Sequence, residues 1–239
     1  MEWDEARLLA LEVEGTYGLA GGGDGGLPTV TAPGVRAVWA WSPGARLAAV
    51  AEDLAGTEHA RRLATDLRAV DYGAETAPPP MRALARTLGG TLTGGPSYVI
   101  PPTLPPLPPA PLPLLVSDAP GRRRAAGLRR PANWAPGEWA DLTAGTLGPW
   151  AMAIEDDTPV SICHTPASTE TSAEAGAWTH PTHRGRRLAP HTVTAWAALQ
   201  RPRNEALFYS TTSDNHPSQA VARTLNLTPL GWLWTLHEG

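Results

Sequence analysis

Apolar residues recur at helical spacing in three segments near the start of the chain. Segment 5–13 has apolar residues three and four positions apart, and segment 54–70 is rich in Ala and Leu. Segment 80–88 begins with prolines and is followed by a glycine pair, which are start and stop signals of a helix. Segment 35–41 is apolar enough for a strand. The pattern predicts a largely helical N-terminal region over residues 1–95.

The pattern changes over residues 96–239, where short β-prone segments alternate with amphipathic ones. The order is one strand, two helices, three strands, and then a helix, a strand, a helix and a closing strand. Asp156-Asp157 forms a natural hairpin turn between two of the strands. The strand candidates are 114–117, 149–155, 159–164, 173–179, 207–211 and 230–236, and the main helix candidates are 136–144, 190–199 and 217–225. Such alternation predicts a second domain of the α/β (α+β) class.

Three low-complexity stretches interrupt these elements. Residues 21–26 predict a flexible glycine loop. Residues 101–113, with prolines at most positions, predict a polyproline II strut that acts as a linker, and their PxxP spacing leaves docking to an aromatic groove as an alternative. The basic run 122–130 is either a solvated helix face or a contact for a phosphorylated ligand or nucleic acid.

Composition limits the classes of protein that fit. With 239 residues and 42% apolar content, the chain can bury a large core in one domain or two. A net charge of −4 argues against general affinity for nucleic acid. The single cysteine, Cys163, excludes an internal disulfide framework and fits a reducing compartment. No apolar run approaches the ~18 residues of a membrane span, and the first residues are acidic, unlike a secretion signal. We therefore expect a cytoplasmic protein with no membrane partner.

Candidate chemistry is concentrated in residues 176–189. A strand-like segment there enters a turn with Arg184, Arg186 and Arg187, and the turn opens directly into a helix. The first amides of a helix lack partners within it, and the helix dipole adds positive charge at the same end. The sequence therefore predicts a phosphate or pyrophosphate site at this turn.

The same turn contains a second, weaker pattern. His180 and His183, together with Cys163 and His164 elsewhere, are residue types that bind zinc. The histidine pair lies inside the anion turn, however, and no further ligand is close in sequence. We therefore predict no metal site.

The turn and its flanks resemble the GCN5-related N-acetyltransferase (GNAT) superfamily over roughly residues 97–239. The family signature is Arg or Gln, two residues, Gly, one residue, then Gly or Ala, between its fourth strand and third helix. Residues 184–189 read Arg-Gly-Arg-Arg-Leu-Ala, so Arg187 replaces the central glycine. Thr179-His-Pro181 stands where the family commonly has Val-x-Pro. Residues 208–225 look like the family's fifth strand and fourth helix, with Asn215 matching and Ala222 replacing a tyrosine.

The resemblance implies a mixed, mostly antiparallel sheet flanked by helices, and acetyl-CoA as cosubstrate. The pantetheine arm is expected to pair with the 177–179 backbone as an added strand, and the pyrophosphate to lie on the amides of 184–189. Asn215 is expected to face the far part of the pantetheine. The expected cofactor contacts are Ala177, Trp178, Thr179, Arg184, Gly185, Arg186, Arg187, Leu188, Ala189, Asn215 and Ser218.

Amine attack on a thioester requires a proton acceptor and a donor for the departing thiolate. Glu174, on the strand where family members commonly carry a glutamate, is the first candidate for the base; the alternative is a solvent-facing carboxylate. Tyr209 is the candidate acid, because Ala222 cannot donate a proton; the alternative is a packed tyrosine. His164 is a further candidate base or a structural histidine. Cys163 fits a buried residue better than an acyl-carrying nucleophile.

The sequence thus predicts an acetyl-CoA-dependent N-acetyltransferase that acetylates a primary amine of a small molecule or peptide in a ternary complex. Residues 1–95 would shape the acceptor side or represent a divergent half-copy of the fold. One alternative is a domain that binds acyl-CoA without catalysis, as a sensor or scaffold. Another is an interaction or nucleic-acid module built on 101–113 and 122–130. The acceptor and the oligomeric state are left open.

Overall fold

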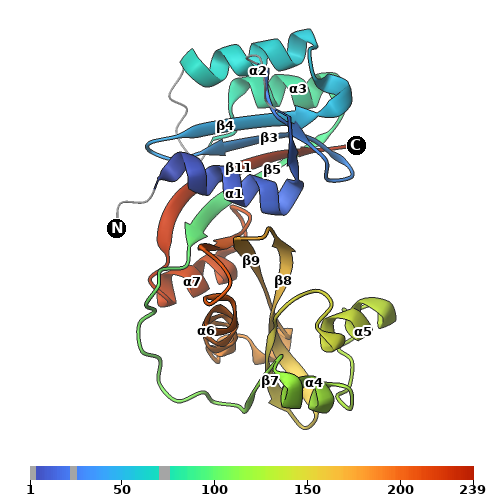
Figure 1. Ribbon diagram of the computed structural model, residues 1–239, viewed down its shortest axis with the longest axis vertical. Helices are drawn as coiled ribbons and strands as arrows, with labels where there is room; N and C mark the ends of the chain where they lie inside the picture. Colours follow the sequence, from blue (N-terminus) through green and yellow to red (C-terminus); the bar gives the residue numbers. More distant parts are fainter. Residues whose placement is uncertain (1–3, 22–25, 70–75) are drawn as a thin grey trace. The chain divides into compact units, whose positions relative to one another are not determined.

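A computed structural model of the chain describes residues 4–21, 26–69 and 76–239 (Figure 1). Most of the predicted glycine loop at 21–26, and residue 70 at the end of one predicted helix, lie outside the described residues. The chain divides into two compact units. Unit 1 comprises Met1–Val99, Ser210–His216 and Thr228–Gly239, and unit 2 comprises Ile100–Tyr209 and Pro217–Leu227.

The strands of unit 1 form a sheet in the order β1-β2-β4-β3-β11-β5, and helices lie on both faces of this sheet (Figure 1). Its elements are α1 (Glu5–Tyr17), β1 (Leu19–Ala20), β2 (Thr29–Val30), β3 (Val35–Trp41), β4 (Arg46–Ala51), the 3-10 helix η1 (Glu52–Leu54), α2 (Glu58–Ala69), α3 (Pro79–Leu88), β5 (Thr91–Val99) and β11 (Thr228–His237). The three predicted helices and β3 are present, whereas β4 and β5 are strands that the sequence pattern does not predict.

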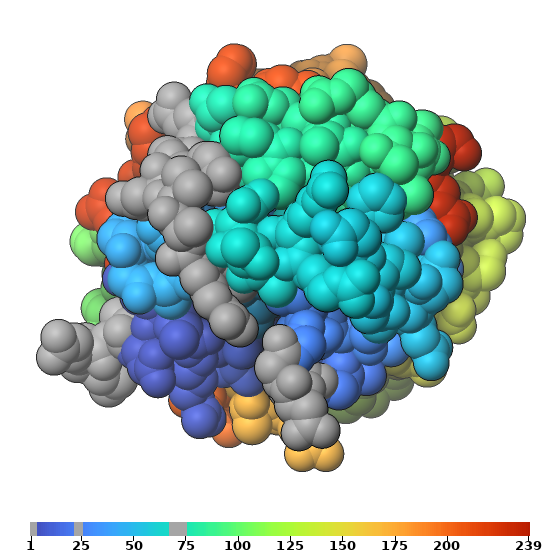
Figure 2. All heavy atoms as spheres, turned by 90° about the horizontal axis from the view of Figure 1, so that it is seen from above, coloured from blue at the N-terminus to red at the C-terminus, as the bar shows by residue number. Residues whose placement is uncertain are grey.

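The helices of unit 1 bury the two faces of its central strands. Five of the seven residues of β3 are buried, because α1 contacts one face and α2 and α3 cover the other. Leu63 of α2 and Met81 of α3 are buried in one cluster with Trp39 of β3. Figure 2 shows α2 and α3 side by side, covering the outer surface of this layer.

Strand β11 differs from the expected domain division. The sequence places residues 228–239 with the second domain, but β11 pairs antiparallel with β3 and β5 in unit 1. Trp234 lies opposite Trp39 in this ladder, and Trp232 lies opposite Trp41. Alternating apolar residues identify a strand but do not specify which strand it pairs with, so the partner is not visible in the pattern.

Unit 2 is a mixed sheet with the strand order β10-β9-β8-β7-β6. Its elements are β6 (Leu114–Val116), α4 (Ala119–Ala125), α5 (Pro136–Ala144), β7 (Ala151–Glu155), β8 (Thr158–Ser168), β9 (Ser172–Thr179), the 3-10 helix η2 (Pro181–His183), α6 (Leu188–Gln200), β10 (Ala206–Ser210) and α7 (His216–Thr224). Strand β9 pairs parallel with β10, and the other ladders of this unit are antiparallel. The predicted class, a mixed and mostly antiparallel sheet flanked by helices, is confirmed.

Helix α6 covers one face of β7, β8 and β9, while α4 and α5 lie on the other side of these strands (Figure 1). On the α6 side, Trp196 Nε1 and Gln200 Nε2 both donate to Thr165 Oγ1, each at 2.9 Å. On the other side, Trp134 and Trp150 are buried with Ile162 of β8. The hydrogen bonds to Thr165 join the second half of α6 to β8.

The two remaining low-complexity stretches lie at the surface of unit 2. Residues 101–113 form neither helix nor strand, and Arg201 Nη2 anchors their start by donating to the carbonyl oxygen of Ile100 at 2.7 Å. The first arginines of the basic run, Arg122 to Arg124, lie exposed on α4, as a solvated helix face requires. Among the described residues, none of the helices combines the length and apolarity needed to cross a bilayer.

Candidate functional site

Strands β9 and β10 share only a short ladder and then part. Their parallel register runs from Ala206–Ser172 to Phe208–Glu174. Beyond that point β9 continues to Thr179, paired on its other side with β8. Residues 176–179 are half-exposed, and they include the predicted cofactor contacts Ala177, Trp178 and Thr179. An unpaired strand edge offers its amides and carbonyls to any extended ligand that carries amide groups.

The end of β9 leads into a tight turn that starts α6. After η2, residues 184–187 are exposed, and α6 begins at Leu188, two residues before the predicted start. Two residues of the turn have left-handed backbone, Gly185 with φ of 77° and Arg187 with φ of 59°. Glycine adopts this conformation freely, whereas it is uncommon for arginine. Arg187 therefore occupies the signature's glycine position with glycine-like backbone geometry.

The N-terminus of α6 carries no cap of its own. Its N-cap residue is Arg187, which makes no side-chain cap hydrogen bond, and the first turn contains no acidic residue. The guanidinium of Arg187 has no ion pair within the described part of the chain. Arg184 Nε lies 3.4 Å from the carbonyl oxygen of Thr179. Leu188 is buried and Ala189 is half-buried, so the exposed charge at this helix end is the Arg187 guanidinium, and the helix dipole adds partial positive charge beside it.

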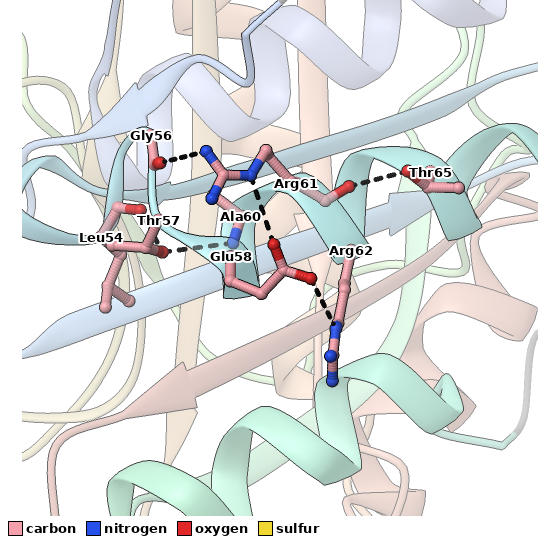
Figure 3. A network of polar contacts seen from close by, with 8 residues as sticks. All are labelled: Leu54, Gly56, Thr57, Glu58, Ala60, Arg61, Arg62 and Thr65. Atoms are coloured by element: carbon pink, nitrogen blue, oxygen red, sulfur yellow. Dashed lines mark hydrogen bonds and ion pairs between the residues drawn. The ribbon is translucent and has the colours of Figure 1, made fainter.

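The helix start in unit 1 provides an internal contrast, because β4, η1 and Gly56 lead into α2 in the same way. There, Thr57 Oγ1 accepts from the amide of Ala60 at 3.3 Å (Figure 3). Glu58 stands in the first turn and binds Arg61 at 3.3 Å and Arg62 at 3.0 Å. That helix end is capped and neutralised by its own side chains. Of these two helix starts, the one before α6 has neither a side-chain cap nor an acidic residue in its first turn.

One carboxylate and two histidines form a network of polar contacts between the turn and the end of β7. Glu155 lies 2.7 Å from His183 Nε2 and 3.2 Å from Arg186 Nη1. These neighbours, His183 first, hold the pKa of Glu155 below its usual range. Thr182 Oγ1 lies 2.8 Å from His180 Nδ1 and 2.9 Å from His183 Nδ1. Arg186 is therefore occupied by Glu155, unlike Arg187.

The histidine pair is part of this network rather than of a metal cluster. Throughout residues 4–21, 26–69 and 76–239, no group of three or more His, Cys, Asp or Glu side chains is placed to hold a metal ion.

Glu174 lies where the two strands part. It is the last residue of β9 that pairs with β10, and it is only 8% exposed. The alternative of a solvent-facing carboxylate is therefore wrong. Strand alternation places Glu174 on the same side of β9 as Gly176 and Trp178. A buried carboxylate beside a free strand edge is in a suitable position to accept a proton from a group held at that edge.

Cys163, on the neighbouring strand, is fully buried and has no disulfide partner. Burial, and secondarily the negative charge of Glu174, raise the pKa of the Cys163 thiol well above its usual value. The thiolate is the nucleophilic form, so burial disfavours the acyl-carrier role and agrees with the buried residue that the sequence favours.

Tyr209 follows the last paired residue of β10 and is 1% exposed. Its hydroxyl lies 2.5 Å from Ser218 Oγ on α7. Ala222, which replaces the family's tyrosine, is buried on the same helix. The hydroxyl of Tyr209, the predicted acid, therefore contacts Ser218, a residue predicted to bind the cofactor. Tyr209 lies on β10, the strand that pairs with β9 at Glu174.

His164 is half-buried on β8, and its ring lies 5.0 Å from that of Trp134, centroid to centroid. Gly176 leaves the space for this ring, because a Cβ there would lie 2.6 Å from His164 Cε1. Burial lowers the pKa of His164, so the imidazole is neutral at pH 7. Its role as a base stays a prediction. Asn215 is exposed before α7 in a segment of unit 1, and its role also stays a prediction.

Glu155 is the site residue that sequence reasoning misses. The sequence predicts the hairpin at Asp156-Asp157, which directly follows it. However, the two partners of Glu155 lie 28 and 31 residues away, and no short-range pattern links them. An isolated glutamate at a strand end is normally a solvated side chain.

No protein-family model and no curated protein matches this sequence. Solved structures do match. A GCN5-related N-acetyltransferase from Kribbella flavida is 14% identical, covering 100% of this chain and 96% of its own, with a TM-score of 0.49. A GNAT-family protein from Novosphingobium aromaticivorans is 18% identical, covering 91% and 88%, with a TM-score of 0.47. A tandem GNAT protein from the clavulanic acid biosynthesis pathway is 18% identical, covering 87% and 84%, with a TM-score of 0.45. The chain is thus similar to structures from the superfamily that its turn resembles.

Proposed function

We propose that the chain is an acyl-CoA-dependent N-acyltransferase that uses acetyl-CoA to acetylate a primary amine. The proposal rests on two features that follow one another along the chain. The unpaired edge of β9 leads through η2 and the exposed turn 184–187 to an uncapped helix start, where Arg187 has no ion pair among the described residues. An elongated ligand with amides at one end and a diphosphate at the other fits these features in that order.

The chain's own groups would bind the donor in two places. The pantetheine amides pair with the backbone of Ala177 to Thr179, extending the sheet by one strand at the unpaired edge. The diphosphate lies against the first amides of α6 and the guanidinium of Arg187. Arg186 contributes less direct charge, because Glu155 already binds it.

With the donor bound in this way, the proposal puts the thioester at the fork between β9 and β10. Glu174 accepts a proton from the acceptor's ammonium group, and the neutral amine then attacks the carbonyl carbon. A C–N bond forms, the nitrogen of the tetrahedral intermediate loses its second proton to solvent, and collapse of the intermediate breaks the C–S bond, after which Glu174 returns its proton to solvent. The Tyr209 hydroxyl, oriented by Ser218, donates a proton to the leaving thiolate and is reprotonated from solvent. The products are the N-acetyl amine and free CoA.

A second candidate is an acyl-CoA sensor or scaffold without catalysis. Two observations favour it: Arg187 occupies the signature's glycine position, and Ala222 replaces the family's tyrosine. The fold and cofactor turn serve both candidates equally, so only turnover distinguishes them.

A paired experiment tests both candidates. Thermal denaturation with CoA and acetyl-CoA measures binding, and saturation at about 100 times the dissociation constant adds about 2.7 kcal/mol of stability. Release of free thiol from acetyl-CoA with a panel of amines measures turnover. Binding with turnover supports the enzyme, binding without turnover across the panel supports the sensor, and no stabilisation by CoA contradicts both.

A further inference from the structure

The turn that opens α6 is fastened to the end of β7 by a single carboxylate. Glu155 is the last residue of β7, and its oxygens lie 2.7 Å from His183 Nε2 and 3.2 Å from Arg186 Nη1. His183 ends η2, and Arg186 directly precedes the N-cap of α6. One side chain therefore binds the turn on both sides of Gly185.

The backbone between these contacts needs such support. Gly185 and Arg187 both have positive φ, and this conformation costs free energy for an arginine. It persists only where surrounding contacts favour it over the ordinary helical or extended alternatives. In this conformation Arg187 is exposed at the N-cap of α6, directly before the first helical amides. The turn is also held by the Thr182 hydroxyl between two histidines, by the contact of Arg184 with Thr179, and by backbone hydrogen bonds from His183 and Arg184 within η2.

We propose that Glu155 is a positioning residue of the acyl-CoA site. It holds the 183–187 turn in the conformation that presents amides and the Arg187 guanidinium to a diphosphate. The inference rests on the proposed function, since it assigns Glu155 to that same site. It adds a residue that lies outside the signature and does not itself contact the cofactor.

Electrostatics alone predicts the opposite effect for this residue, which makes the inference easy to test. A carboxylate near a binding site for a polyanion repels the ligand and competes with it for Arg186. If charge were the whole effect, removing it would tighten CoA binding. If Glu155 acts by positioning, removing it weakens binding despite the more favourable charge.

The test compares three variants by calorimetric titration with CoA at fixed ionic strength. E155Q removes the charge and the ion pairs, and we expect the dissociation constant to rise by about tenfold. E155D keeps the charge but is one methylene shorter, so it cannot reach both partners and also weakens binding. D157N is the matched control. Asp157 lies exposed in the adjacent turn without an ion pair among the described residues, and its φ of 60° suits asparagine. D157N removes the same charge nearby, so its affinity should be unchanged or slightly higher.

Turnover with acetyl-CoA gives a second readout. E155Q should raise KM for acetyl-CoA while kcat changes little, because Glu155 does not touch the reacting atoms. If the wild type binds CoA, and both E155Q and E155D bind it as tightly or more tightly, the inference is overturned and the proposed function stands. If E155Q does not fold, as judged by its melting without ligand, E155D alone decides. Absence of CoA binding by the wild type overturns the proposed function and the inference with it.

Discussion

Glu174 and Phe208 form the last residue pair that β9 and β10 share before the two strands part. The buried carboxylate therefore lies at the base of the fork, and Tyr209 is the first residue of β10 beyond it. The two candidate groups lie on neighbouring strands at the fork, and strand alternation places the side chain of Tyr209 on the face of the sheet opposite to that of Glu174. Their assignment to opposite steps of one transfer reaction stays a prediction.

Replacing Glu174 by Gln should lower kcat for acetyl transfer by about 100-fold or more, because a positioned general base contributes about 10²- to 10⁴-fold. The amide keeps the shape of the side chain but cannot accept the ammonium proton. Affinity for CoA should remain close to that of the wild type. Initial rates of thiol release over a range of pH measure the effect.

The control for this variant is E170Q, since Glu170 lies exposed at the turn before β9. E170Q should retain the wild-type rate. An E174Q enzyme whose rate and pH–rate profile match the wild type would remove Glu174 as the base.

Removing the Tyr209 hydroxyl tests the proton donor. Y209F keeps the buried ring but loses the contact with Ser218, so the free energy of unfolding should fall by only about 1 kcal/mol. If the hydroxyl protonates the thiolate, the rate should fall by about 10²-fold. S218A separates the roles, because it keeps the tyrosine hydroxyl and removes its contact with the Ser218 hydroxyl. An S218A rate close to wild type with a strongly reduced Y209F rate supports Tyr209 as the acid; equal, small losses contradict it.

The sequence predicts the local features of this site well and the long-range ones poorly. The turn before α6 is local, since its strand, its charges and its helix start are contiguous in the chain. Strand β5 is hidden from pattern analysis because Gly94, Gly95 and Pro96 are strand breakers. The structure tolerates them, since the ring of Trp234 packs where a Cβ of Gly94 would lie. Partners such as β11 in unit 1 depend on pairings that residue periodicity does not encode.

Histidine burial predicts how stability depends on pH. Burial lowers the pKa of His164 below its ordinary value of 6.5, and burial also lowers that of His191. As the pH falls, the unfolded chain therefore takes up these protons before the folded chain does. The stabilisation is present above about pH 6.5 and is lost as the pH falls through the lower folded pKa values.

The melting temperature, measured from about pH 7.5 down to about pH 5.5, should therefore decrease, and H164N should show a shallower decrease than the wild type. H59N is the control, because His59 lies on α2, which belongs to unit 1, whereas His164 belongs to unit 2. A wild-type slope retained in H164N would show that protonation of His164 contributes nothing in this range.

Charge reversal at Arg187 tests the placement of the diphosphate directly. The side chain is exposed and has no ion pair among the described residues, so R187E should leave the fold intact. It places a carboxylate at the uncapped start of α6, where it competes with the ligand for the first amides and repels its phosphates. We expect CoA affinity to fall by at least about tenfold, with a larger effect at low salt, because exposed charges are screened over about 10 Å at 0.1 M salt. R203E makes the same change just beyond the other end of α6 and should leave CoA affinity unchanged. If R187E and R203E bind CoA as the wild type does at both salt concentrations, the diphosphate does not lie at this turn.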